Sequence, residues 1–243
     1  MGAILDRRPR FFRFGRSAAL VVGLSLLCTI GSIIFIQSQR DEPSQGGRGR
    51  EWPDIPSDAK GAVDALRDGD VDAFKRILDS QPDLAAKEVP ALGTLLHLAA
   101  ANGNVRVAQM LIDRHADVNA RNDRGLTPLH YASLVGKEPM VRLLIEHGAD
   151  VNARSETDWT PLLFAARGSS FVDQPDADYI GVCDDLLRGG AQVDAISAMG
   201  RSAIQIATEP VARFLYAHGA KLTAMSTPTL EEENNSVDTG GNK

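Results

Sequence analysis

Residues Leu126–Arg154 read LTPLHYASLVGKEPMVRLLIEHGADVNAR, and most of the chain repeats this stretch. A similar run opens at Thr94, 33 residues before Thr127 (127 − 94), and another opens at Thr160, 33 residues after it (160 − 127). The closing Ala-Asp-Val-Asn-Ala-Arg of residues 116–121 recurs at residues 149–154 with the same spacing. A fixed period of this length indicates a repeat protein, in which neighbouring units bury a shared core.

Each unit contains two short apolar segments around a glycine turn. Thr127 can cap the first helix, Pro128 suits its first turn, and Gly136 stands where a positive φ ends it. The period and the Thr-Pro-Leu-His-x-Ala motif together resemble the ankyrin repeat. The resemblance implies an all-α solenoid with a helix-turn-helix and a hairpin loop per repeat. It also implies that His97 and His130 hydrogen-bond to backbone between repeats.

About five repeats are expected within an ankyrin repeat domain spanning residues 58–225. Their predicted bounds are 59–88, 92–121, 125–154, 158–195 and 200–224. The first lacks the Thr-Pro-Leu-His opening and is more polar, as a terminal repeat must be. The fourth holds nine extra residues within 167–179, which we expect to form an exposed loop between its helices. The last lacks four residues at the same turn, so Glu209-Pro210 starts its second helix directly.

Residues 17–36 form an uncharged apolar segment, SAALVVGLSLLCTIGSIIFI. A helix of that length spans about 30 Å, the thickness of a bilayer hydrocarbon core. A cleaved signal peptide would have a shorter apolar region and small residues at its end, and Gln37-Ser38-Gln39 makes a poor cleavage site. Lipid modification at Cys28 is disfavoured because Leu26-Leu27 precedes it. We predict an N-terminal transmembrane helix that is not cleaved.

The charges around this segment predict its orientation. Residues 1–16 hold five arginines, a basic cytoplasmic head, whereas only Arg40, Arg48 and Arg50 follow, among acidic residues. The prediction is a single-pass type II protein in the cell membrane, with its ankyrin domain extracytoplasmic and periplasmic if the source is bacterial. Residues 37–57, rich in glycine and proline, are predicted to be a flexible linker. Residues 226–243 are predicted to be a disordered acidic tail.

The charge balance disfavours a nucleic-acid partner. The net charge of −6 divides into +4 for residues 1–39 and −10 for residues 40–243, and phosphate binding needs clustered Lys and Arg. One of the two cysteines, Cys28, lies in the apolar segment, so Cys183 has no disulfide partner in the repeat domain. This fits a reducing compartment, and equally a periplasmic domain without disulfides.

The sequence offers no recognisable catalytic or cofactor motif. It contains no Gly-x-Ser-x-Gly, no Walker-type Gly-Lys-Ser/Thr and no dinucleotide fingerprint, so we predict no enzyme, no cofactor and no small-molecule substrate. The five histidines show no metal-ligand spacing, so no metal site is predicted. One alternative is a hydrolase-like enzyme using the inserted loop 169–178, which has serines and aspartates but no histidine. Another is a structural protein that self-associates through its transmembrane helix, where Gly23 and Gly31 offer a weak close-packing face.

The favoured function is binding of an unidentified protein partner, as a scaffold or regulator. In ankyrin proteins partners bind the concave side, formed by hairpin tips and the first helix of each repeat. Trp and Arg are favoured at binding hot spots, and we expect Arg124, Trp159 and Arg201 to line up along the stack. Alternatively, Trp159 simply packs over the adjacent hairpin. The candidate protein-binding residues are Asp123, Arg124, Leu126, Leu134, Val135, Glu156, Trp159, Arg167 and Arg201.

Overall fold

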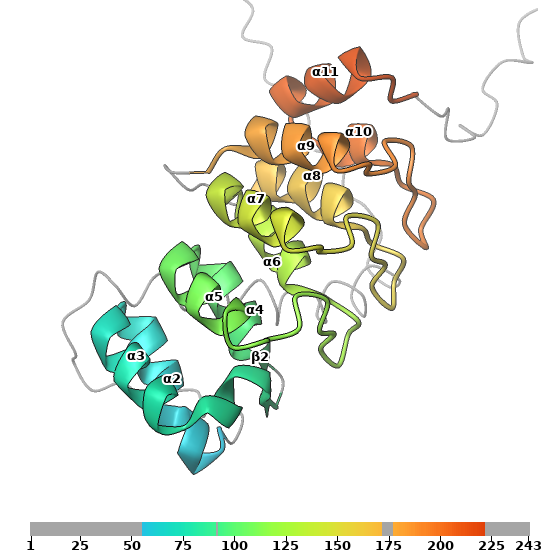
Figure 1. Ribbon diagram of the computed structural model, residues 1–243. Helices are drawn as coiled ribbons and strands as arrows, with labels where there is room; N and C mark the ends of the chain where they lie inside the picture. The colour runs from blue at the N-terminus through green and yellow to red at the C-terminus, as the bar shows by residue number, and fades with distance from the viewer. Residues whose placement is uncertain (1–54, 91, 172–176, 222–243) are drawn as a thin grey trace, which may run out of the picture. The chain divides into compact units, whose positions relative to one another are not determined.

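The computed structural model describes residues 55–90, 92–171 and 177–221, all within the unit Gly47–Lys243. Helices in this part of the chain form five consecutive pairs (Figure 1). The pairs are α2 (Ser57–Asp68) with α3 (Val71–Ser80), α4 (Leu95–Asn102) with α5 (Val105–Ile112), α6 (Pro128–Leu134) with α7 (Glu138–Glu146), α8 (Pro161–Phe171) with α9 (Tyr179–Arg188), and α10 (Ala203–Ile206) with α11 (Glu209–Ala217). The predicted all-α solenoid is confirmed.

The pairs stack in chain order, so that each helix packs against its counterparts in the neighbouring repeats. The first helices form one row in the order α2, α4, α6, α8, α10, and the second helices form another in the order α3, α5, α7, α9, α11. Between the first two pairs lie a 3₁₀ turn, η1 (Pro82–Ala86), and a short antiparallel pair of strands, β1 (Glu88–Val89) and β2 (Gly93–Thr94). The later pairs are connected by extended hairpins that project to one side (Figure 1).

The core consists of leucines around a column of alanines. Ala99, Ala132 and Ala165 recur every 33 residues on α4, α6 and α8, and all three are completely buried. A methyl side chain at this position lets the three first helices approach one another closely, because nothing larger stands between them. The larger side chains that fill the remaining space include Phe74, Leu66, Leu78, Leu95, Leu96, Leu111, Leu129, Met140, Leu144, Leu162, Leu163 and Leu186.

Helix starts and ends follow the local sequence. Thr94 and Thr127 each form a capping box with the histidine three residues later. Asp70 and Asn104 begin the second helices, where their side chains accept hydrogen bonds from backbone N–H groups. Gly136 follows α6 with φ 68°, a left-handed conformation that costs glycine little. In these repeats the capping residues and the glycine therefore set where each helix begins and ends.

The last two pairs depart from the regular pattern in the predicted places. α10 has only four residues, and α11 begins at Glu209 with Pro210 in its first turn. The extra residues of the fourth repeat lie between α8 and α9. They do not all form a loop, however, because α8 continues through Ser169 and Ser170 to Phe171. Residues 172–176 lie outside the described residues.

No helix within the described ranges is long and apolar enough to cross a membrane. The predicted transmembrane helix of residues 17–36 lies outside these ranges, as do the basic head and the acidic tail. Of the predicted linker, only its last three residues are described, and Ser57 already belongs to α2.

Candidate functional site

The three hairpins that follow α5, α7 and α9 share one backbone design. In the first of them, the Oδ1 atom of Asn122 accepts hydrogen bonds from the backbone N–H groups of Arg124 and Leu126, each at 3.0 Å. The backbone N–H of Asn122 also donates to the carbonyl oxygen of Leu126 (3.0 Å). A serine replaces the asparagine in the next two hairpins, where Ser155 pairs in the same way with Trp159 and Ser197 with Arg201.

Neighbouring hairpins are joined by backbone bonds. The N–H of Glu156 donates to the carbonyl oxygen of Arg124 (3.0 Å), and the N–H of Ala198 donates to that of Thr157 (3.1 Å). The guanidinium of Arg121 also donates to the carbonyl oxygen of Arg154 (3.0 Å). The hairpins therefore form one continuous ladder whose backbone is fixed before any partner arrives.

Two buried histidines connect the first helices to this ladder. The Nδ1 atom of His97 accepts from the N–H of Thr94 (3.0 Å), and its Nε2 atom donates to the carbonyl oxygen of Leu126 in the next hairpin (3.0 Å). His130 repeats this arrangement with Thr127 and the carbonyl oxygen of Trp159. Burial lowers the pKa of both imidazoles to about 4, so both are neutral near pH 7. The predicted structural role of these histidines is confirmed.

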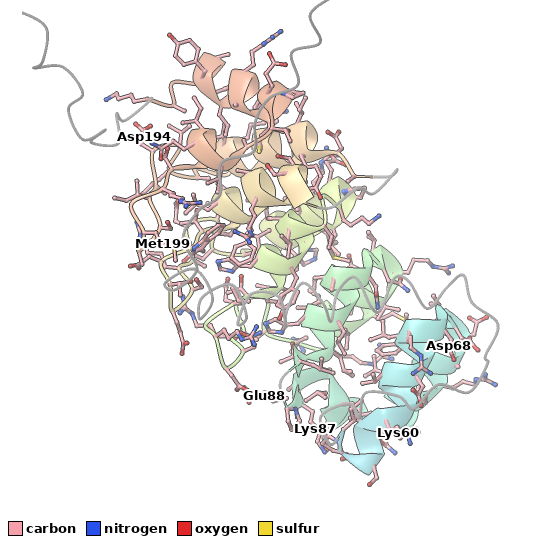
Figure 2. All side chains as sticks on the ribbon, turned by 180° about the vertical axis from the view of Figure 1, so that it is seen from behind. Lys60, Asp68, Lys87, Glu88, Asp194 and Met199 are labelled. Atoms are coloured by element: carbon pink, nitrogen blue, oxygen red, sulfur yellow. The ribbon has the colours of Figure 1, made fainter. Side chains whose placement is uncertain are left out.

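The last hairpin lacks this connection. Leu163 occupies on α8 the position that His130 occupies on α6 (163 − 130 = 33), and its side chain has no hydrogen-bonding group. The carbonyl oxygen of Arg201 therefore accepts from the N–H of Ser197 but from no histidine. This hairpin carries two of the large apolar side chains exposed among the described residues, Ile196 (48% exposed) and Met199 (51% exposed). Figure 2 shows Met199 on the side from which the hairpins project.

The predicted binding residues divide by exposure. Asp123, Glu156 and Arg201 are exposed, and Arg124 and Arg167 are half-buried. The other four are buried: Leu126, Leu134, Val135 and Trp159. Whether any of the nine contacts a partner stays a prediction.

Leu134 and Val135 are buried at the end of α6, beside residues at the C-terminal end of the insertion. The hydroxyl of Tyr179 donates to the carbonyl oxygen of Leu134 (3.1 Å), and the N–H of Asp178 donates to that of Gly136 (2.9 Å). On the other side α8 lies so close that a Cβ atom at Gly168 would stand 2.2 Å from the Leu134 carbonyl oxygen. The sequence contains these residues, but no periodic signal indicates that they fold back onto α6.

Trp159 packs within the repeat stack. Its side chain is 7% exposed, and its ring meets that of Phe164 edge-on at a centroid distance of 5.4 Å. Its burial indicates a packing role, but the ring that it contacts belongs to Phe164 of α8 and not to the adjacent hairpin of the alternative. The expected line of Arg124, Trp159 and Arg201 is also wrong. Hairpin bonds place Trp159 with Arg201, whereas Arg124 occupies the position of Thr157 in its own hairpin.

Two of these arginines nevertheless lie near aromatic side chains, Arg167 at Trp159 and Arg124 at Tyr131. The guanidinium carbon of Arg167 lies 5.3 Å from the centroid of the Trp159 ring. Burial lowers the pKa of Arg167, and the nearby charge of Arg201 lowers it further. The charge of Arg124 in turn acts on the hydroxyl of Tyr131, whose pKa is raised mainly by burial. The choice of candidates by residue type found the arginines but missed Tyr131 and Phe164. These two aromatic residues occupy the variable position of the Thr-Pro-Leu-His-x-Ala motif in consecutive repeats.

The groups considered for catalysis have structural roles. The hydroxyl of Ser169 donates to the carbonyl oxygen of Ala166 (2.7 Å), and that of Ser170 donates to Ile206 (2.8 Å). Cys183 is completely buried, which raises the pKa of its thiol to about 12. Among the described residues, no three His, Cys, Asp or Glu side chains are grouped as metal ligands would be. Ser169 and Ser170, the described serines of the inserted segment, thus both donate to backbone carbonyl oxygens.

Comparison with known proteins identifies the repeats. The family model described as "Ankyrin repeats (3 copies)" matches residues 62–155 and again residues 96–178. The chain is 43% identical over 68 residues to "E3 ubiquitin-protein ligase XBAT33" of Arabidopsis thaliana, which is 28% of this chain and 13% of that protein. It is 40% identical over 68 residues, with the same coverage, to "Probable E3 ubiquitin-protein ligase XBOS33" of Oryza sativa subsp. japonica.

These relatives correct the prediction that the protein is not an enzyme. They are named as ubiquitin-protein ligases. The lack of a recognisable catalytic motif therefore does not show that a chain with repeats of this kind is not an enzyme. The matched segment covers only 13% of their length. The 33-residue period, the paired helices with projecting hairpins and the family match agree, and the chain belongs to the ankyrin repeat family.

Proposed function

We propose that the protein binds a protein partner through its hairpins and the adjoining first helices α6, α8 and α10. The observation that carries this proposal is the exposure of Ile196 and Met199 on a hairpin that also presents Arg201. Large apolar side chains grouped with arginine on an otherwise polar surface are typical of protein interfaces. Ankyrin repeats imply a protein-binding scaffold, and this surface fits that general role.

The hairpin ladder supports the proposal energetically. Binding is weakened when loops must be ordered, because each immobilised group loses conformational entropy. Here the backbone of three successive hairpins is already held by bonds from Glu156, Ala198 and the two buried histidines. A partner therefore meets a preorganised surface and loses little of its interaction free energy to ordering.

The proposed place of this binding is a membrane surface. Residues 17–36 would anchor the protein as a single-pass type II chain, with the repeats on the extracytoplasmic side as scaffold or regulator. The uncharged run of 20 residues and the arginines before it support this. The ligase activity in the relatives' names is not proposed for this chain, since the match covers 28% of it.

Affinity capture with the full-length chain in detergent tests the binding surface. Met199→Asp is expected to abolish recovery of the partner, because it places a charge in the apolar centre of the surface. The matched control is Tyr216→Asp, which introduces the same charge at a residue 65% exposed on the second-helix side, in α11. Loss of the partner from Tyr216→Asp, with retention by Met199→Asp, would assign binding to the second helices and contradict the proposal.

A further inference from the structure

The last hairpin, residues 197–201, lacks the histidine bond that holds the base of the other two. The carbonyl oxygens of Leu126 and Trp159 each accept one bond from the first residue of their hairpin and a second from a histidine, all at 3.0 Å. The carbonyl oxygen of Arg201 accepts the first kind of bond, also at 3.0 Å, but Leu163 occupies the position of the histidine. Leu163 is completely buried and has no hydrogen-bonding group. No bond of this kind therefore joins the last hairpin to α8.

The side chain at the base of the last hairpin differs as well. Leu126 is 6% exposed and Trp159 is 7% exposed, so each of them anchors its hairpin in the repeat stack. A buried apolar side chain resists displacement, because moving it would return apolar surface to water. Arg201 holds the equivalent position and is exposed. The last hairpin therefore lacks the apolar anchor as well as the histidine bond.

Fewer side-chain bonds also hold the backbone within the last hairpin. The Oδ1 atom of Asn122 accepts from two backbone N–H groups, each at 3.0 Å, and the Oγ atom of Ser155 accepts from two, at 3.1 and 3.3 Å. Within the described residues, the Oγ atom of Ser197 accepts from one such group, that of Arg201 at 3.4 Å. The bond from the N–H of Ala198 to the preceding hairpin, at 3.1 Å, keeps the tip in the ladder. The base of the last hairpin is the part that can move.

Two large apolar side chains are exposed on this most weakly held hairpin. Ile196 comes directly before it and is 48% exposed, and Met199 at its tip is 51% exposed (Figure 2). Methionine is unbranched, and its three rotatable bonds let it fit apolar surfaces of different shape. Proteins that bind several partners use flexible methionines and movable loops in this way. The same combination is present here on one short segment.

We propose that the last hairpin is the adjustable part of the binding surface, and that its base shifts until Ile196 and Met199 fit apolar side chains of the partner. The first two hairpins keep their places and orient that partner. Leu163 is then a positioning residue, because it leaves the carbonyl group of Arg201 free to move without touching the partner itself. The inference rests on the proposed function and adds to it the part of the surface that adapts and the apolar chemistry that it recognises.

Amide hydrogen exchange of the full-length chain in detergent tests the mobility of the hairpin. The N–H groups of Asn122, Ser155 and Ser197 are matched probes, because each donates to the base carbonyl oxygen of its own hairpin at 3.0 Å. The protection factor of Ser197 should be about tenfold below those of the other two, since one hydrogen bond at its acceptor is missing. Leu215, buried in α11, reports on unfolding of the whole last repeat and should be better protected than Ser197. Equal protection of the three hairpin probes would overturn the inference, and so would equal protection of Ser197 and Leu215.

Interchanging the two residue types tests the role of Leu163. Leu163→His places an imidazole at the position equivalent to His130, below the carbonyl oxygen of Arg201, and should raise the protection factor of Ser197 about tenfold. His130→Leu is the converse change and should lower the protection factor of Ser155 by a similar factor. The second variant decides the matter if the first does not fold. Unchanged protection at the probe of a folded variant would overturn the inference.

Peptides selected from a phage-displayed random library on the full-length chain separate this inference from the proposed function. Peptides that lose binding to Met199→Asp should contain apolar residues and should raise the protection factor of Ser197, while that of Asn122 stays unchanged. Peptides that bind without changing the protection of Ser197 would overturn the inference and leave the proposed surface intact. Peptides that bind Met199→Asp as well as wild type would contradict both, and so would a library from which no binding peptide is recovered.

Discussion

The Nε2 atom of His130 lies 3.0 Å from the carbonyl oxygen of Trp159, 29 residues further along the chain. A carbonyl oxygen can only accept, so Nε2 carries the hydrogen and Nδ1 is left to accept from the N–H of Thr127. One neutral ring thereby caps α6 and fixes the next hairpin. Protonation would turn Nδ1 from an acceptor into a donor, and the cap would be lost.

Acidification should destabilise the domain in a defined pH window. His97 and His130 titrate near pH 4 in the fold against an ordinary value of 6.5, so their stabilisation is complete above pH 6.5. As the pH falls from 6.5 towards 4, the unfolded chain binds protons that the folded chain does not. The free energy of unfolding should therefore fall by up to about 2.7 kcal/mol per pH unit for the two groups. Chemical denaturation across this window measures the slope.

His130→Gln is the control for that slope. Gln205 already fills the equivalent position of α10, where its side-chain oxygen accepts from the N–H of Ser202 (3.0 Å). A glutamine can thus retain the cap without titrating, and the slope should fall by half. An unchanged slope in the variant would show that other groups cause the acid sensitivity.

Trp159→Ala should lower stability before it affects any partner. The ring is 7% exposed and packs on Phe164, so its removal should cost about 3–5 kcal/mol of unfolding free energy. Arg201→Ala, at the equivalent position of the last hairpin, should change stability by no more than about 0.5 kcal/mol because its side chain is exposed. Thermal unfolding of both variants measures these two changes in stability. An unchanged melting temperature for Trp159→Ala would restore its predicted role as a binding anchor.

Most of the fold was predictable from the sequence because its signals are local and repeated. Thr-Pro at residues 127–128 sets the start of α6, Gly136 sets its end, and the same residue types recur at a fixed period. Each repeat contacts mainly its neighbours, so one unit recognised correctly places the next. Even the irregular fourth and fifth repeats follow from counting residues between Thr160 or Ser202 and the closing alanine.

The candidate site was less predictable, because exposure depends on contacts that the period does not encode. Val135 at the end of α6 is buried, and residues at the end of the insertion donate hydrogen bonds to its neighbours Leu134 and Gly136. Trp159 has the composition of a binding hot spot, yet Phe164 on the next helix gives it a place to pack. The burial of Trp159 depends on the residue type at position 164, and that of Leu134 on a tyrosine 45 residues away, and the period specifies neither.

The membrane topology is open to a direct test. Five arginines precede residues 17–36 and three follow within the predicted linker, so the head should remain in the cytoplasm. A reporter enzyme that is active only outside the cytoplasm, fused after Lys243, should therefore be active in intact cells. The same fusion with residues 1–36 deleted should be inactive. Activity of a cytoplasm-only reporter at the same position would reverse the predicted orientation.

Two helical glycines should respond in opposite ways to the same substitution. A Cβ atom at Gly168 would lie 2.2 Å from the carbonyl oxygen of Leu134 and 2.6 Å from the ring of Tyr179, so Gly168→Ala must push α8 away from α6. Overpacking of this kind costs about 1–3 kcal/mol. At Gly61 on α2 the nearest atom is that of Ile77 at 3.5 Å, an ordinary contact.

Gly61→Ala should therefore stabilise the domain by about 0.5–1 kcal/mol, because alanine loses less conformational entropy in a helix. Denaturant unfolding of both variants measures the difference. If Gly168→Ala were as stable as wild type, α6 and α8 could not approach as closely as described. The same close approach holds Leu134 inside, so the exposure of that residue would then have to be reconsidered.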